Sequence, residues 1–82
     1  MIVKDKIDRI VSIEWEDSYH DSEWLGRETA RERCRPAKCK TVGYLLKSNF
    51  REVTVFQSKS DSGHITDTMS IPKKVIKSIK YL

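Results

Sequence analysis

The clearest pattern of apolar and polar positions along this 82-residue chain lies between residues 40 and 58. Two runs rich in β-branched and aromatic side chains flank a polar break at residues 47–49, a pattern that predicts an antiparallel hairpin. Because side chains alternate between the two faces of a strand, Val42 and Tyr44 share one face of the first run. Val55 lies on the apolar face of the second run. We expect the rest of the chain to add strands beside this hairpin.

A first strand is predicted over residues 10–17, because apolar and polar residues alternate from Val11 to Glu16 within it. Trp15 is in phase with the apolar positions, so we expect it to lie in the core. Taken with the hairpin and a later strand, the phase of the pattern predicts which side chains are largely buried. These are Trp15, Val42, Tyr44, Val55 and Ile71.

The last part of the chain predicts two strands with a break between them. Residues 65–71 alternate, although Asp67 interrupts their apolar face. Pro72 cannot donate a hydrogen bond to a neighbouring strand, so the strand is expected to stop there. One turn of tight helix then suits residues 73–75, and a last short strand is predicted over residues 77–82.

One short helix is predicted over residues 26–35. Ala30 and Cys34 are four residues apart and form a narrow apolar stripe on it. Pro36 ends the helix, because it disfavours helical geometry in the residue before it. So narrow a stripe indicates a mostly exposed helix on a sheet edge or barrel mouth, with Cys34 packing it onto the sheet.

The elements together predict one small domain over residues 1–82, of the mainly β (α+β) class. The order suits a small five-stranded SH3- or Sm-like barrel with one short helix between strands one and two. A membrane-spanning helix needs about 20 apolar residues, and the sequence has no such run. The start of the chain lacks the apolar core of a secretion signal, so we expect a cytoplasmic protein with free thiols.

Several segments of the chain resemble segments of a known group of proteins. Residues 13–18, Trp24, residues 41–45 and residues 71–79 resemble a group of short phage- and prophage-encoded proteins without an assigned function. The last of them also looks like the strand–turn–strand ending of Sm-like and SH3-like barrels. The resemblance implies a viral accessory protein that acts in the host cytoplasm, for example against host defence, and it implies no catalytic residues. Small barrels also pair edges between subunits, so we expect a homo-oligomer.

The net charge is +4, and the charges are segregated along the chain. A basic stretch follows residue 26, and in it Arg27, Arg31 and Arg35 recur every four residues, as on one helix face. Guanidinium groups in such a row suit phosphates. The leading hypothesis is therefore a protein that binds a phosphate-bearing ligand, either a nucleotide signal or nucleic acid. The side chains predicted to bind it are Arg27, Arg31, Arg35, Lys38 and Lys40.

A second basic group lies near the C-terminus, and its members are Lys73, Lys74, Lys77 and Lys80. These lysines could simply keep an edge strand soluble. A platform for single-stranded nucleic acid also needs aromatic side chains among its cations. Tyr44 or Phe50 would have to come close to the Arg row to supply them.

The alternative hypothesis is an inhibitor that binds a host protein. Residues 14–23 contain five carboxylates and no Lys or Arg, and Trp24 follows them. Tryptophan is a common anchor in protein interfaces. The side chains predicted to contact the partner are Glu14, Glu16, Asp17 and Trp24. The structural alternatives are a solvated surface of mixed charge and a tryptophan that packs against one end of the barrel.

The sequence predicts neither a metal site nor a catalytic one. Zinc would have to take Cys34 and Cys39 together with His20 and His64, and this spacing does not repeat a tight cysteine pair. His20 near Asp17 could form an oriented general base, but no marked nucleophile accompanies it. We therefore expect a binding protein that is not an enzyme and needs no cofactor.

Overall fold

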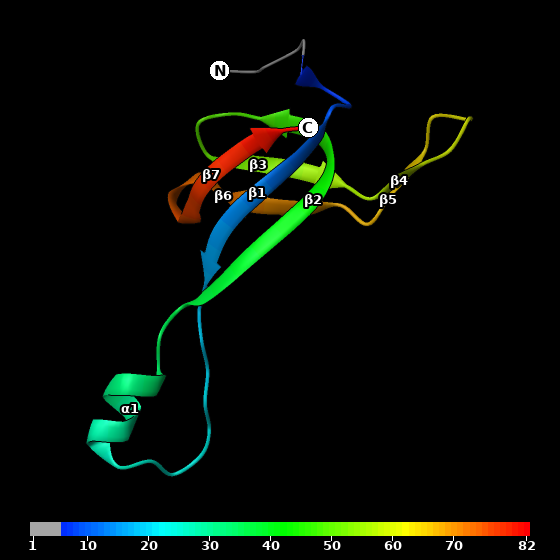
Figure 1. Cartoon of the computed structure of the whole chain (residues 1–82). Coiled ribbons are helices and arrows are strands. Elements are labelled where there is room, and N and C mark those ends of the chain that lie inside the picture. Colours follow the sequence, from blue (N-terminus) through cyan, green and yellow to red (C-terminus); the bar gives the residue numbers. More distant parts are fainter. Residues whose placement is uncertain (1–5) are drawn as a thin grey trace.

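The computed structural model describes residues 6–82, and its strands and helices follow the predicted order (Figure 1). The sheet strands are β1 (Ile10–Asp17), β2 (Ala37–Ser48), β3 (Glu52–Phe56), β6 (Met69–Pro72) and β7 (Ile76–Tyr81). A separate two-stranded ribbon consists of β4 (Ser58–Lys59) and β5 (Ile65–Thr66). The helices are α1 (Arg27–Arg33) and the 3-10 helix η2 (Lys73–Val75).

The five main strands form one antiparallel sheet in the order β6-β3-β2-β1-β7. The predicted hairpin is its centre, formed by β2 and β3. The two edge strands, β6 and β7, are joined by η2 but do not pair with each other. Residues 6–82 are thus mainly β with one α-helix, as predicted, while the expected closed barrel is wrong.

The predicted strand over residues 65–71 is divided in two. Its first part, β5, belongs to the ribbon with β4, and its second part, β6, pairs with β3. Asp67 lies between them with a φ of 55°, in the left-handed region that non-glycine residues rarely adopt. This residue also interrupts the apolar alternation, so the break in the pattern coincides with a break in the strand.

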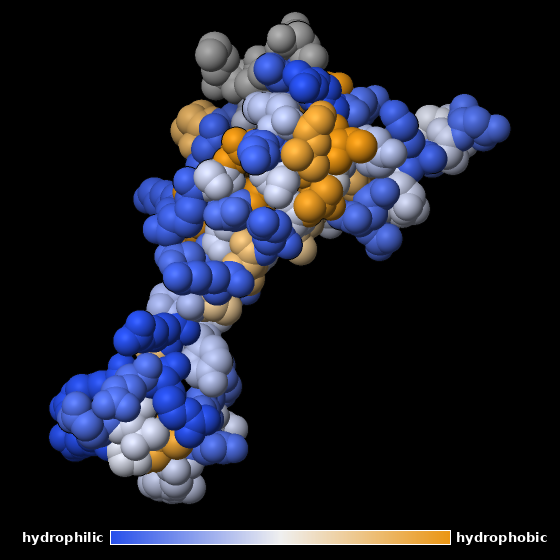
Figure 2. Space-filling view, in the orientation of Figure 1, coloured by the Kyte–Doolittle hydropathy of each residue, from blue (hydrophilic) through white to orange (hydrophobic). Residues whose placement is uncertain are grey.

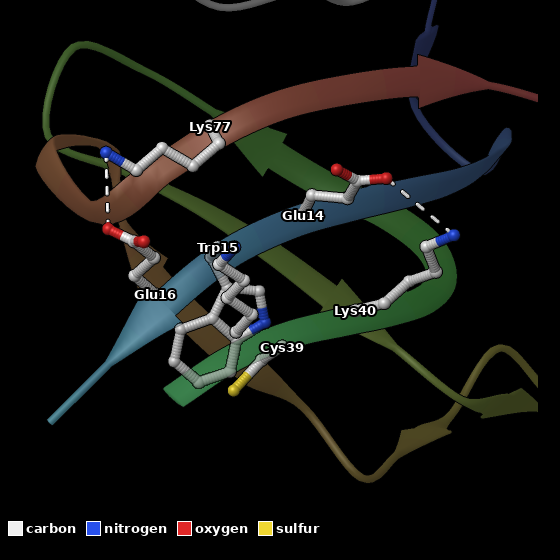
Figure 3. Close-up of a pocket in the computed structure, with 7 residues that line it drawn as sticks. Glu14, Trp15, Glu16, Cys39, Lys40 and Lys77 are labelled. Atoms are coloured by element: carbon white, nitrogen blue, oxygen red, sulfur yellow. Dashed lines mark ion pairs between the residues drawn. The ribbon is translucent and has the colours of Figure 1, made fainter. Parts of the chain in front are cut away.

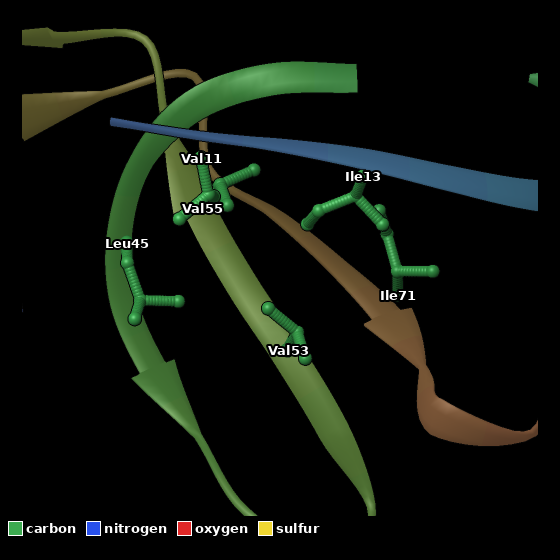
Figure 4. Packing of buried hydrophobic residues seen from close by; sticks show 6 residues of the cluster. All are labelled: Val11, Ile13, Leu45, Val53, Val55 and Ile71. Atoms are coloured by element: carbon green, nitrogen blue, oxygen red, sulfur yellow. The ribbon is translucent and has the colours of Figure 1, made fainter. Parts of the chain in front are cut away.

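The core lies on one face of the sheet and draws on β1, β2, β3 and β6 (Figure 4). Its buried side chains are Val11, Ile13, Leu45, Val53, Val55 and Ile71. Val55 and Ile71 are therefore confirmed as core residues. Trp15 packs against this cluster from its margin and is only half-buried.

The expected phase of β2 is wrong, because Gly43 and Leu45 face the core in place of Val42 and Tyr44. Val42 is 46% exposed. Tyr44 is half-buried on the opposite face, where its ring stacks on Phe56 with centroids 5.3 Å apart. The run has apolar residues in both phases, and the core-facing phase includes a glycine, which weakens its apolar signal. Alternation alone could not decide between the two faces.

The segment between β1 and β2, residues 18–36, forms an arm that projects from the sheet and carries α1 (Figure 1). It makes the molecule elongated, with extents of 53 × 25 × 20 Å. No residue of α1 is buried. Cys34 is exposed as well, so the expectation that it packs the helix onto the sheet is wrong.

Candidate functional site

The arm presents the largest exposed apolar side chain among the described residues. Trp24 stands just before α1 and is fully exposed. Figure 2 shows a mainly hydrophilic surface over the arm, whereas hydrophobic surface gathers over the sheet. The tryptophan therefore neither belongs to the core nor covers one end of the sheet. It is available for contact with another molecule.

Few interactions stabilise the helix of the arm. It spans seven residues, Arg27–Arg33, and Gly26 at its start offers no side-chain cap. Isolated helices shorter than about 12 residues are marginal in water. Tertiary packing normally supplies the missing stability, but α1 has no buried residue. A contact with a second molecule would supply it here.

The predicted row of three arginines is not formed. The helix ends at Arg33, and Cys34 after it is extended, with φ −86° and ψ 95°. Arg35 therefore lies beyond the helix, so it does not continue the face that carries Arg27 and Arg31. Arg31 is also engaged, because its Nη1 donates to Glu28 Oε2 at 2.8 Å.

The other predicted anion ligands, Lys38 and Lys40, lie on β2 directly opposite the acidic residues of β1. The register pairs Glu14 with Lys40 and Glu16 with Lys38. Lys40 Nζ lies 3.7 Å from Glu14 Oε1, and Lys77 Nζ of β7 lies 3.3 Å from Glu16 Oε1 (Figure 3). The structure thus places part of each predicted site on one surface, where Lys40 pairs with Glu14, while the predicted arginines and Trp24 lie on the arm.

An open groove of about 440 Å³ lies on this surface beside Trp15. Its lining residues are Glu14, Trp15, Glu16, Lys38, Cys39, Lys40 and Lys77. Trp15 is fixed, since its Nε1 donates to Thr41 Oγ1 at 2.9 Å. The mixed charge of the groove suits neither a strongly anionic nor a strongly cationic ligand.

A smaller hollow lies at the base of the arm, where the two chain segments come together. It encloses about 300 Å³ and is lined by Ser18, Tyr19, Cys34, Arg35 and Pro36. Tyr19 is 48% exposed, so a second aromatic ring of the arm is accessible. Asp17, the remaining carboxylate of the predicted acidic site, ends β1 and accepts a hydrogen bond from Ser18 N at 2.8 Å where the arm begins.

The arm as a whole carries balanced charge. Residues 18–36 contain four arginines and four carboxylates. The arginines are Arg27, Arg31, Arg33 and Arg35, and the carboxylates are Asp21, Glu23, Glu28 and Glu32. The arm therefore has no net positive field that would attract a polyanion.

Residues 6–82 do not bring three His, Cys, Asp or Glu side chains together as a metal site. His64, one of the conceivable zinc ligands, contacts Ser62 Oγ at 3.0 Å in the turn between β4 and β5. None of the helices in this part of the chain is long and apolar enough to cross a membrane.

Sequence reasoning missed the contribution of Lys77 to the groove. Its contact with Glu16 depends on the pairing of β1 with β7, which shifts between Glu14 and Trp15. No local sequence pattern predicts such a shift in strand register. Comparisons of the chain with family models, with curated proteins and with solved structures found no match.

Proposed function

We propose that this protein is a non-catalytic binding domain that uses its arm to contact a partner protein. The observation that supports the proposal is the full exposure of Trp24 on a projecting segment. Removing a tryptophan side chain from water is worth on the order of 4 kcal/mol, given the area that aromatic residues bury. An interface centred on this ring would recover that free energy.

The composition of the arm favours a protein partner over a phosphate-bearing ligand. Tryptophan and arginine are the residues most enriched at the energetic centres of protein interfaces. Both occur here in a segment of balanced charge, in which Arg31 already has a carboxylate partner. A host protein bound and blocked in this way would suit the accessory role that the resemblance to phage-encoded proteins suggests.

Docking would also stabilise α1. The seven-residue helix buries none of its own side chains, so a partner surface would provide the packing that such helices need. Part of the binding free energy would be spent on ordering the arm, which lowers affinity for a given contact area. We therefore propose a specific interface of moderate affinity in which Trp24 is the dominant contact.

The architecture of the sheet supports a second, structural proposal. The strand order β6-β3-β2-β1-β7 and the 3-10 turn between the last two strands support the proposal of an SH3-like or Sm-like domain that has not closed. Within residues 6–82 the edge strands β6 and β7 each pair with one strand, so we propose that copies of the chain pair through these edges. Light scattering at about 100 μM tests this, since a monomer mass there would contradict it.

A photo-crosslinking amino acid at position 24 tests the arm proposal in the host cell. The matched control places the same group at Leu82, which is also exposed but directly follows β7. A protein crosslinked from position 24 and not from position 82 is then purified and titrated by calorimetry. We expect Trp24→Ala to weaken its binding at least tenfold and Leu82→Ala to leave it unchanged. Equal binding by the Trp24→Ala variant would refute the proposal.

A further inference from the structure

The turn between β2 and β3 lies against η2, on one side of the sheet and apart from the arm (Figure 1). Lys73 N donates to Arg51 O at 2.8 Å, which joins the two segments. This contact brings residues 22 positions apart in the sequence side by side. Arg51 of the turn thereby becomes a neighbour of Lys73, which begins the 3-10 helix and is followed by Lys74.

The turn is held in one conformation by Asn49. Its Oδ1 accepts hydrogen bonds from Arg51 N at 2.8 Å and from Glu52 N at 3.0 Å. Its backbone N donates to Glu52 O at 3.1 Å. Phe50 lies inside this bonded loop with its side chain 77% exposed. A large apolar ring is therefore presented to solvent by a turn that is already ordered.

The cations of this turn and of η2 form no ion pair among the described residues. Arg51, Lys73 and Lys74 are exposed. The ion pairs found within residues 6–82 use other cations, namely Arg31, Lys40, Lys59 and Lys77. Glu52, the acidic residue next to the turn, is half-buried at the start of β3 and forms none of these pairs.

We propose that Phe50, Arg51, Lys73 and Lys74 form a binding site for single-stranded nucleic acid. The guanidinium carbon of Arg51 lies 5.5 Å from the centre of the Phe50 ring, over one face of it. The other face can stack on an unpaired base, while the two lysines and Arg51 contact the flanking phosphates. Exposed aromatic rings among cations are the combination that single-strand binding sites use.

The same features argue against other anionic ligands. Duplex nucleic acid keeps its base faces stacked inside, so Phe50 would have nothing to stack on. A small nucleotide needs a concave site, and neither of the two hollows includes any of these four residues. A strand can instead extend across an exposed surface and accumulate several weak contacts. This site is independent of the arm and would add a second binding activity to the one proposed above.

Fluorescence anisotropy with a labelled thymidine oligonucleotide of about 15 nucleotides tests the site. We expect Phe50→Ala to weaken binding about tenfold and Phe50→Tyr to retain it, since stacking on one ring is worth about 1–3 kcal/mol. Lys73→Gln combined with Lys74→Gln should make the slope of log Kobs against log salt shallower by about 1.4, because each phosphate that a lysine neutralises contributes about 0.7 to that slope.

The matched control is Lys59→Gln combined with Lys80→Gln. It removes the same charge from two exposed lysines outside the site, and we expect it to leave the salt slope nearly unchanged. Trp24→Ala should bind like the wild type, which separates this site from the arm. The proposal is overturned if the wild type does not bind at about 100 μM protein in low salt. It is also overturned if the two double lysine substitutions reduce the salt slope equally, or if a duplex of the same length binds as tightly as the single strand.

Discussion

The sheet and the arm of this molecule are stabilised in different ways. In the sheet, Val11, Ile13 and Val55 are completely shielded from solvent by neighbouring strands. In the arm, α1 has no buried residue, and Trp24 is fully exposed. The sheet therefore carries the stability of the fold, and the arm can change its contacts while the core stays intact. A segment on which the stability of the core does not depend is suited to binding a partner.

The two regions also differ in how their charges are arranged. On the sheet, ion pairs join separate strands, as between Glu14 and Lys40 or between Glu16 and Lys77. On the arm, the pair of Arg31 with Glu28 stays within one helical turn. Within residues 6–82, no ion pair or side-chain hydrogen bond joins α1 to the sheet. Substitutions in each region test whether the two are energetically separate.

The largest effect is expected from a charge in the core. Val55→Asp should unfold the domain, because an unpaired buried carboxylate costs several kcal/mol, on the order of the whole stability. Val42→Asp is the matched control, since Val42 is 46% exposed on the opposite face of the sheet. It should change the free energy of unfolding by less than about 1 kcal/mol. Thermal melts followed by circular dichroism compare the two, and equal losses would contradict the strand register.

A smaller but clear loss is expected from Gly43→Ala. The added Cβ would lie 3.0 Å from Phe56 O and 3.2 Å from Val55 Cβ, closer than ordinary contacts. We expect a loss of about 1–3 kcal/mol in a urea titration, the usual cost of overpacking. Gly26→Ala, at the start of the arm helix, meets nothing within 4 Å. If Gly26→Ala lowered the free energy of unfolding as much as Gly43→Ala does, the arm would contribute to global stability.

Breaking an ion pair on the sheet should cost less still. Lys77→Gln removes the contact with Glu16, but both side chains reach solvent, and such pairs are worth less than about 1 kcal/mol. Lys80→Gln removes an equal charge from the same strand outside the observed ion pairs. A double-mutant cycle that adds Glu16→Gln isolates the pair. A coupling well above about 1 kcal/mol would mean that the groove is more rigid than its exposure indicates.

No effect on global melting is expected from Ala30→Gly. Ala30 lies within α1, accepting from Cys34 N and donating to Gly26 O, both at 2.9 Å. Glycine lowers helix stability by about 1 kcal/mol relative to alanine, so amide hydrogen exchange in α1 should become faster. The core amides of β1 to β3 should exchange as in the wild type. Faster exchange in those strands would show that the arm and the sheet are coupled after all.

Several local elements of this protein were predictable from its sequence, but the ribbon of β4 and β5 was not. The alternation from Val11 to Glu16 predicted a strand over residues 10–17, and β1 has these bounds. Pro72 predicted the break that η2 occupies, whereas the helix that Pro36 was expected to end at residue 35 already ends at Arg33. These features are local, because a strand period or a proline restricts the backbone of its own neighbourhood.

The tertiary structure decided which faces and charges meet. Alternation separates the two faces of β2, but only packing on β1 and β3 buries Gly43 and leaves Val42 exposed. The pairing of Glu14 with Lys40 follows from the register of two strands whose partners lie 26 residues apart. The hydrogen bond from Lys73 N to Arg51 O likewise depends on the order of the strands in the sheet. Such contacts join residues distant in sequence, so no local pattern contains them.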